Sequence, residues 1–281
     1  MIRFGPSGND KKFYEAGNKS TLQAPRWVAD MGLNAYEYSF GRGINIGDEK
    51  AAAIAEEAKK HDVAISVHAP YYINFANPDD AKAENSYRYV LDSMAKAKVF
   101  GGNRVVFHPS TVGKMTRAEA VALTKKRIAI LADLAKSNVT GEFWLCPETM
   151  GKINQIGDVQ EVTDFCALAD FFLPTVDFGH INARTYGSLK TQQDYEAILQ
   201  HIQNVLGHER ASKMHIHFSK IEYSQGGEVR HLTFEDNVFG PEFEPLAKAI
   251  KKFGLSPVII CESDGTQAVD ALQMKRIFES L

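Results

Sequence analysis

The stretch Val63-Ala64-Ile65-Ser66-Val67-His68 decides the fold class of this chain. Its β-branched residues, at positions 63, 65 and 67, alternate with small or polar ones, and a period of two is the pattern of a β-strand. One face of the strand is therefore apolar enough to pack under a helix. The other face carries Ser66 and ends on His68, so the strand combines an apolar outer face with a polar inner one.

Strands of this kind recur along the chain and alternate with amphipathic helical stretches. We expect strands near residues 2–6, 34–40, 63–69, 104–108, 142–148, 172–178, 213–219 and 257–262. We expect helices near residues 21–32, 47–61, 79–100, 116–137, 158–170, 190–206, 241–253 and 266–280. Eight strands that are each followed by a helix predict an α/β fold, a single (β/α)8 TIM barrel over residues 1–281.

Local features support this assignment. Thr116 and Glu119 have the spacing of a capping box, Asp79 and Asp158 stand at expected helix starts, and Gly207 and Gly254 stand at expected ends. An open doubly wound sheet is the alternative, but no glycine-rich phosphate motif follows the first strand. The longest stretch without a predicted element is 220–240, and long loops in barrels are often functional.

Composition narrows the class of protein. The chain is 44% apolar and 24% charged, with no apolar run long enough to span a bilayer and no signal-peptide pattern at its start. Its three cysteines are scattered, which favours a reducing, cytoplasmic location over a disulfide framework. The net charge of −3 argues against a nucleic-acid partner, although carboxylates that bind cations contribute to that charge. We expect a monomer without a membrane partner.

The strands from the third to the eighth all end in a side chain that can bind a metal ion or move a proton. These side chains are His68, His108, Glu148, Asp177 with His180 close behind it, His215 and His217, and Glu262. His231 lies in the loop after the seventh strand. The carboxyl ends of barrel strands form the active-site face, so we expect a metal site there.

Imidazole and carboxylate ligands together suit Zn²⁺ best, with Mn²⁺ or Fe²⁺ as alternatives. The chain offers more such ligands than one ion needs, and a central carboxylate can bridge two ions.

The order of the motifs resembles endonuclease IV, the AP endonuclease family within the xylose isomerase-like barrels. The motifs are His68-Ala69-Pro70-Tyr71, Phe107-His108-Pro109, Glu148-Thr149-Met150-Gly151-Lys152, Asp177-Phe178-Gly179-His180, His215-Ile216-His217-Phe218-Ser219-Lys220, Arg230-His231 and Glu262. The resemblance runs from about residue 34 to residue 263.

The resemblance implies a metal-dependent hydrolase with two or three ions, typically zinc, that cuts double-stranded DNA 5′ to abasic sites. A metal-activated hydroxide would attack the phosphorus. The implied ligands are His68, His108 and Glu148 for one metal, Glu148, Asp177, His215 and Glu262 for a second, and His180 and His231 for a third. Glu148 and Glu262 are the implied catalytic carboxylates, and Arg42, Tyr71, Tyr72 and Lys220 the implied DNA-binding residues.

The sequence departs from this family at three places. Val229 stands where the family has an aspartate ligand of the third metal, and only the neighbouring Glu228 offers a substitute. The loop 39–45 keeps a single base, Arg42, where the family's DNA-penetrating loop is rich in polar and basic residues. His217 stands where the family has asparagine, so it is either a supporting group or a rival ligand to His215.

Two other functions remain open. A sugar or sugar-phosphate isomerase or epimerase would use Glu148 and Glu262 for proton transfer and Glu37 to bind a hydroxyl. The other is a non-catalytic barrel, which would have lost a metal and would bind its ligand without converting it. A nuclease should carry a basic rim, and the candidates are Arg42, Lys114, Lys152, Arg184, Lys220 and Arg230.

Overall fold

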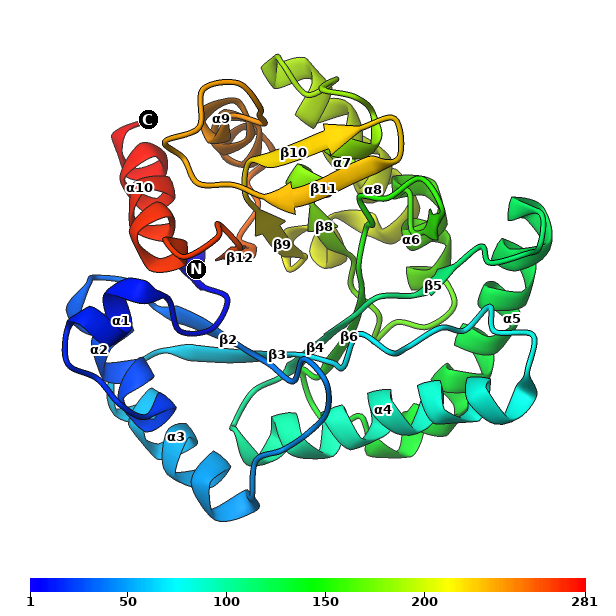
Figure 1. Cartoon of the computed structure of the whole chain (residues 1–281), viewed down its shortest axis with the longest axis horizontal. Coiled ribbons are helices and arrows are strands. Elements are labelled where there is room, and N and C mark those ends of the chain that lie inside the picture. The colour runs from blue at the N-terminus through cyan, green and yellow to red at the C-terminus, as the bar shows by residue number, and fades with distance from the viewer.

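Eight parallel strands surround one central axis in the computed structural model, which describes residues 1–281 (Figure 1). They are β1 (Arg3–Pro6), β2 (Ala35–Ser39), β3 (Ala64–His68), β4 (Arg104–Phe107), β6 (Trp144–Pro147), β8 (Thr175–Asp177), β9 (His215–Phe218) and β12 (Val258–Cys261). Their order is β1-β12-β9-β8 in one half and β2-β3-β4-β6 in the other. Parallel bridges Ser7–Glu37 and Glu148–Thr175 join the halves, so the ring closes and the predicted TIM barrel is confirmed.

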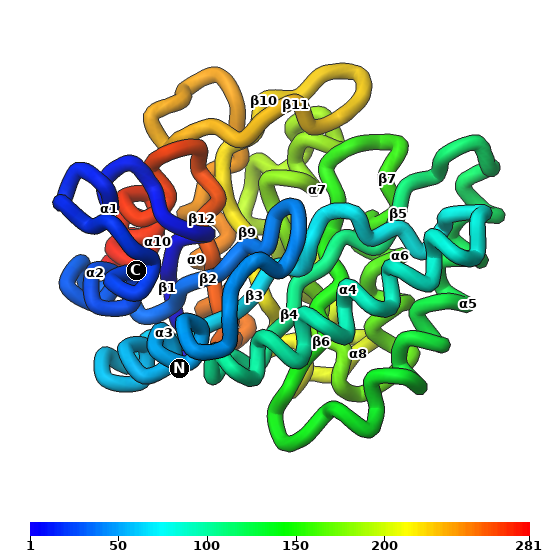
Figure 2. Tube along the Cα trace, turned by 60° about the horizontal axis from the view of Figure 1, so that its bottom comes forward, coloured from blue at the N-terminus to red at the C-terminus, as the bar shows by residue number.

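Helices cover the outside of the ring (Figures 1 and 2). They are α1 (Lys11–Glu15), α2 (Ala24–Asp30), α3 (Asp48–Lys60), α4 (Asp80–Val99), α5 (Arg117–Ala135), α6 (Val159–Cys166), α8 (Gln192–Ser212), α9 (Phe243–Phe253) and α10 (Gln267–Ser280). Asp79 and the Thr116–Glu119 capping box begin α4 and α5 as predicted. Gly254 ends α9 with φ of 65°, and Gly207 breaks α8 with φ of 80°.

The strands have apolar outer faces, and their inner faces carry polar side chains among apolar ones such as Val258 and Ile260. On β3, Ile65 and Val67 are buried against the helices, while Ser66 and His68 point into the ring. Glu37 of β2 and His215 of β9 are also fully buried there. A barrel filled only for stability would carry branched apolar residues at these positions, so the polar interior indicates a role in function.

The segment 220–240 contains structure that was not predicted. Strands β10 (Ile221–Ser224) and β11 (Gly227–His231) form an antiparallel hairpin that packs on α7 (Phe178–Arg184), a short helix that was also missed. Two further short strands, β5 (Ser110–Thr111) and β7 (Gln155–Ile156), pair with each other. β5 and β7 have only two residues each, too few to show a period in the sequence. None of the helices is both long and apolar enough to cross a membrane.

Candidate metal centre

The first group of ligands gathers at the ends of β3, β4 and β6. His68 is the last residue of β3, His108 follows β4, and Glu148 follows β6. The Nε2 atoms of both histidines lie 3.1 Å from Oε2 of Glu148. The other ring nitrogen of His68, Nδ1, lies 2.9 Å from the carbonyl oxygen of Ala69, which fixes the ring orientation. We call this set the first subsite.

The second subsite shares Glu148 with the first. It comprises Glu148, Asp177, His217 and Glu262, which come from four neighbouring strands. His217 Nδ1 lies 3.1 Å from Oε1 of Glu148 and 3.6 Å from Oε2 of Glu262. Glu148 thus directs one carboxylate oxygen toward each subsite, which is the geometry of a carboxylate that bridges two cations.

The third subsite comprises His180 of α7 with Glu228 and His231 of β11. His180 Nε2 lies 3.5 Å from Oε2 of Glu228, and His231 Nε2 lies 4.0 Å from Oε1 of the same carboxylate. The opposite ring nitrogens are held: His180 Nδ1 lies 2.9 Å from the carbonyl oxygen of Thr149, and His231 Nδ1 lies 2.8 Å from Oγ of Ser219. Both Nε2 atoms therefore face Glu228.

These residues fit divalent cations. In each subsite the ligand atoms lie within 4.8 Å of one another. Asp177 is completely buried, and its Oδ2 has no hydrogen-bond partner, although a buried carboxylate oxygen normally has one. A cation in the second subsite would satisfy this oxygen. The donors are imidazole nitrogens and carboxylate oxygens, the ligands that Zn²⁺, Mn²⁺ and Fe²⁺ accept.

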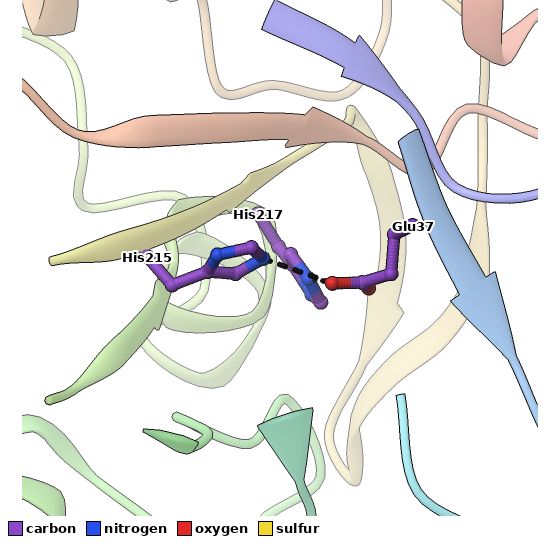
Figure 3. Close-up of side chains that lie close together, drawn as sticks. All are labelled: Glu37, His215 and His217. Carbon is purple, nitrogen blue, oxygen red and sulfur yellow. Dashed lines mark hydrogen bonds and ion pairs between the residues drawn. The ribbon is translucent and has the colours of Figure 1, made fainter. Parts of the chain in front are cut away.

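The strand register separates His215 from the ligands that were expected around it. Asp177 pairs with His217 along β8 and β9, whereas His215 pairs with Thr175, one layer deeper in the barrel. His215 Nε2 contacts Oε2 of Glu37 at 2.9 Å and does not reach the second subsite (Figure 3). The geometry therefore places His217 where the resemblance implied His215.

A β-bulge in β11 explains how Glu228 can take the place of the family's aspartate, although Val229 stands at that position in the sequence. Tyr223 pairs with Glu228 and Glu222 with Arg230, so Val229 is the extra residue of β11. The extra residue shifts the alternation of side chains along the strand. Val229 consequently points outward and is 49% exposed, while Glu228 lies on the same side as His231. Glu228 therefore stands with His180 and His231 in the third subsite, as the substitute that the sequence offered.

The charges of the centre depend on one another. Burial opposes ionisation of Glu148, but His217 and His108 outweigh it and hold the pKa of that carboxyl well below its ordinary value. Burial raises the pKa of Asp177. Burial also lowers the pKa of His215 to about 4, whereas the carboxylate of Glu148 overcomes burial and raises the pKa of His68 to about 9. In the metal-free protein, protonated histidines such as His68 neutralise the negative charge of the buried carboxylates. A bound cation would neutralise the same carboxylates.

A family model described as "Xylose isomerase-like TIM barrel" matches residues 25–277. The chain belongs to this family. An uncharacterized protein of Methanocaldococcus jannaschii, MJ0133, is 35% identical over 98% of this xylose isomerase-like barrel and 96% of its own length. A probable endonuclease 4 of Latilactobacillus sakei is 26% identical over 73% of the chain and 69% of its own length, which agrees with the resemblance described above. The solved structure of a D-tagatose 3-epimerase-like protein superposes with a TM-score of 0.75 at 16% identity, covering 99% and 97% of the two chains.

The mouth of this xylose isomerase-like barrel holds a hollow of about 270 Å³. It is lined by ligands of all three subsites together with Tyr71, Lys152 and other residues. Tyr71 and Tyr72 are 47% and 52% exposed, their rings lie 4.8 Å apart, and Arg42 Nε donates to the Tyr71 hydroxyl at 3.0 Å. The two tyrosines and Arg42 thus form an exposed group beside the metal centre.

Only some of the basic residues expected around the mouth are exposed and without an ion pair. Lys114 and Lys152 are exposed and make no ion pair. Lys220, expected to bind DNA, is buried, because its Nζ donates to the Asp236 carbonyl at 2.7 Å and pairs with Glu242. Arg184 donates to backbone carbonyls of the 150–155 loop, and exposed Arg230 pairs with Glu222. Lys220 and Arg184 therefore support the loops of the mouth.

Glu37 also differs from its expected role. It is completely buried below the second subsite, whereas the isomerase hypothesis gave it a substrate hydroxyl to bind. Its position on the inner face of β2, in register with Ser66, was visible in the alternation of that strand. The sequence did not predict its contacts with His215 and His217, because these residues lie on β9, across the barrel from β2.

Proposed function

We propose that this protein is a metal-dependent phosphodiesterase that cleaves the DNA backbone 5′ to abasic sites. The observation that carries the proposal is the row of three contiguous subsites, with Glu148 shared between the first two. Cations bound there would activate water and neutralise the charge that develops on a phosphodiester. A single proton transfer on a sugar needs no third subsite.

The two carboxylates Glu148 and Glu262 have different roles in this proposal. Glu148 is 1% exposed and is surrounded by histidines, so it can orient ligands but has no access to solvent. Glu262 is 17% exposed and lines the hollow. Glu262 is therefore the carboxylate that can accept a proton from a water molecule beside the substrate.

Features at the mouth support a nucleic-acid substrate. Tyr71 and Tyr72 offer exposed ring faces to an unstacked base or a kinked duplex, and Arg42 and Lys152 can contact phosphates. The similarity to a probable endonuclease 4 covers most of the chain. Because few cations of the rim are free, we expect weaker binding to undamaged DNA than a basic protein of this size would show.

A sugar epimerase or isomerase is the second candidate. The second subsite alone supplies four ligands for one cation, and the fold is similar to that of a D-tagatose 3-epimerase-like protein. This hypothesis gives no role to His180, Glu228 and His231 as a group.

The proposal is tested by incision of a labelled duplex that carries one abasic site, with the metal content of the protein measured first. We expect cleavage 5′ to the lesion, its loss on chelation, and its loss in Glu148→Ala. Glu235→Gln is the matched control, because Glu235 is exposed in the loop after the hairpin and touches no subsite. Intact DNA with metal bound at all three subsites would reject the nuclease and favour the epimerase, which a panel of ketoses then tests.

A further inference from the structure

A buried polar network lies directly beneath the second subsite. Figure 3 shows Glu37 of β2 reaching across the barrel toward His215 and His217 of β9. All three residues are 0% exposed. Ser66 Oγ donates to Oε2 of Glu37 at 2.8 Å, and His215 Nε2 lies 2.9 Å from the same oxygen. The other oxygen, Oε1, lies 2.9 Å from His217 Nε2; the two atoms are not aligned as a hydrogen bond, and neither has another hydrogen-bond partner.

His217 therefore has a carboxylate on each side of its ring. Nε2 faces Glu37, and Nδ1 faces the second subsite, where Oε1 of Glu148 lies 3.1 Å away. A ring that ligates a cation keeps one proton, and a buried carboxylate accepts that proton in a hydrogen bond. A proton on Nε2 would give a partner to both unsatisfied atoms, Nε2 itself and Oε1 of Glu37, and would leave the Nδ1 lone pair for a cation.

The two oxygens of Glu37 have separate partners. Ser66 and His215 both occupy Oε2, so they hold the carboxylate in place without contacting the second subsite. Oε1 is left to His217. Ser66 and His215 thus contact Glu37, and Glu37 contacts His217. The opposite side of the His217 ring faces the second subsite, where a cation would bind.

We propose that Glu37 is a positioning residue, which fixes the tautomer and ring plane of His217 and thereby sets the affinity of the second subsite for a divalent cation. This inference rests on the metal centre of the proposed function. It assigns no contact between Glu37 and substrate. Removal of a carboxylate behind a metal-binding histidine typically lowers metal affinity about 10- to 100-fold.

Zinc titration against a competing chelator tests this inference in the full-length protein. Glu37→Gln should bind one zinc ion per chain about 10- to 100-fold more weakly and the others with unchanged affinity. Ser66→Ala is the matched control: it removes a hydrogen bond from the same carboxylate, at the oxygen that does not face His217. Its affinity should change less than about threefold. Equal affinities in Glu37→Gln and the unmodified protein would overturn the proposal.

A second measurement needs no variant and so is independent of folding defects. ¹⁵N-histidine NMR of the zinc-loaded protein should show His217 protonated at Nε2 and coordinated through Nδ1. Coordination through Nε2 would overturn the proposal, because it would place the cation between His217 and Glu37. Both measurements are independent of DNA cleavage. Weakened zinc binding in Glu37→Gln, together with no incision of abasic DNA, would reject the nuclease and retain the role of Glu37.

Discussion

Oε2 of Glu228 lies 3.5 Å from Nε2 of His180, and the two residues come from hairpin strand β11 and from α7, the helix on which the hairpin packs. The contact depends on the bulge at Val229, which turns Glu228 inward. It adds to His180 and His231 the carboxylate that the sequence offered only as a substitute for an aspartate.

Replacement of Glu228 should therefore remove one cation. In Glu228→Gln we expect one zinc ion per chain fewer than in the unmodified protein, because the amide is a far weaker ligand than the carboxylate. Elemental analysis after gel filtration measures the ratio. Val229→Asp should not raise the zinc content, since its side chain points away from His180. A gain of zinc in that variant would show that the third subsite is incomplete.

His215 and His217 should behave differently although they share one strand face. His217→Ala should lose the cation of the second subsite, because its Nδ1 faces Glu148 and Glu262. His215→Ala should keep the full zinc content but unfold more easily, by about 1–3 kcal/mol, since buried Glu37 loses a donor. Zinc analysis combined with urea denaturation separates the two. The opposite pattern would restore His215 as the ligand.

Gly151 should be required for the third subsite without being a ligand. A Cβ atom at this position would lie 2.7 Å from Cβ of Glu228 and 2.9 Å from Cδ2 of His180. Gly151→Ala should push these two ligands apart and lower the affinity of the third subsite for zinc by about tenfold or more. Gly226→Ala is the control, since its nearest neighbour would be Ser224 Oγ at 3.8 Å. Equal zinc affinity in both variants would contradict the close packing of Gly151.

The metal-free protein should lose stability as the pH rises from 6.5 to 9. The pKa of His68 is raised to about 9 in the folded chain and is about 6.5 when unfolded. Its protonated form therefore stabilises the fold fully below pH 6.5, and this contribution, on the order of 3 kcal/mol, is lost as the pH rises through 9. Bound zinc requires the neutral ring, so zinc binding at pH 7 should release protons.

Urea denaturation of chelated protein at pH 6.5 and 9 measures this effect, and calorimetry in two buffers measures the proton release. His68→Asn should show a smaller difference in stability between the two pH values. Stability that stays constant or increases with pH in the chelated protein would mean that His68 is not protonated beside Glu148.

Local pattern was sufficient for the eight strands of the barrel and for the positions of most of the candidate ligands. The alternation in β3 and its terminal His68 predicted both the inner face and the end of the strand. The predicted positions of His68, His108, Glu148, Asp177 and Glu262 at the mouth agree with the structure, because the carboxyl ends of parallel strands meet at one face of a barrel. Their roles as ligands and catalytic groups stay predictions.

The sequence by itself determined the eightfold alternation of strands and helices and the polar face of strands such as β3, because these follow from periods of two and 3.6 along the chain. Only the tertiary structure decided between His215 and His217, between Val229 and Glu228, and between exposure and burial of Lys220. Each of these choices depends on strand register, on a bulge or on a loop contact. Such features arise from pairing between distant segments, and a shift of one or two residues leaves the local pattern almost unchanged.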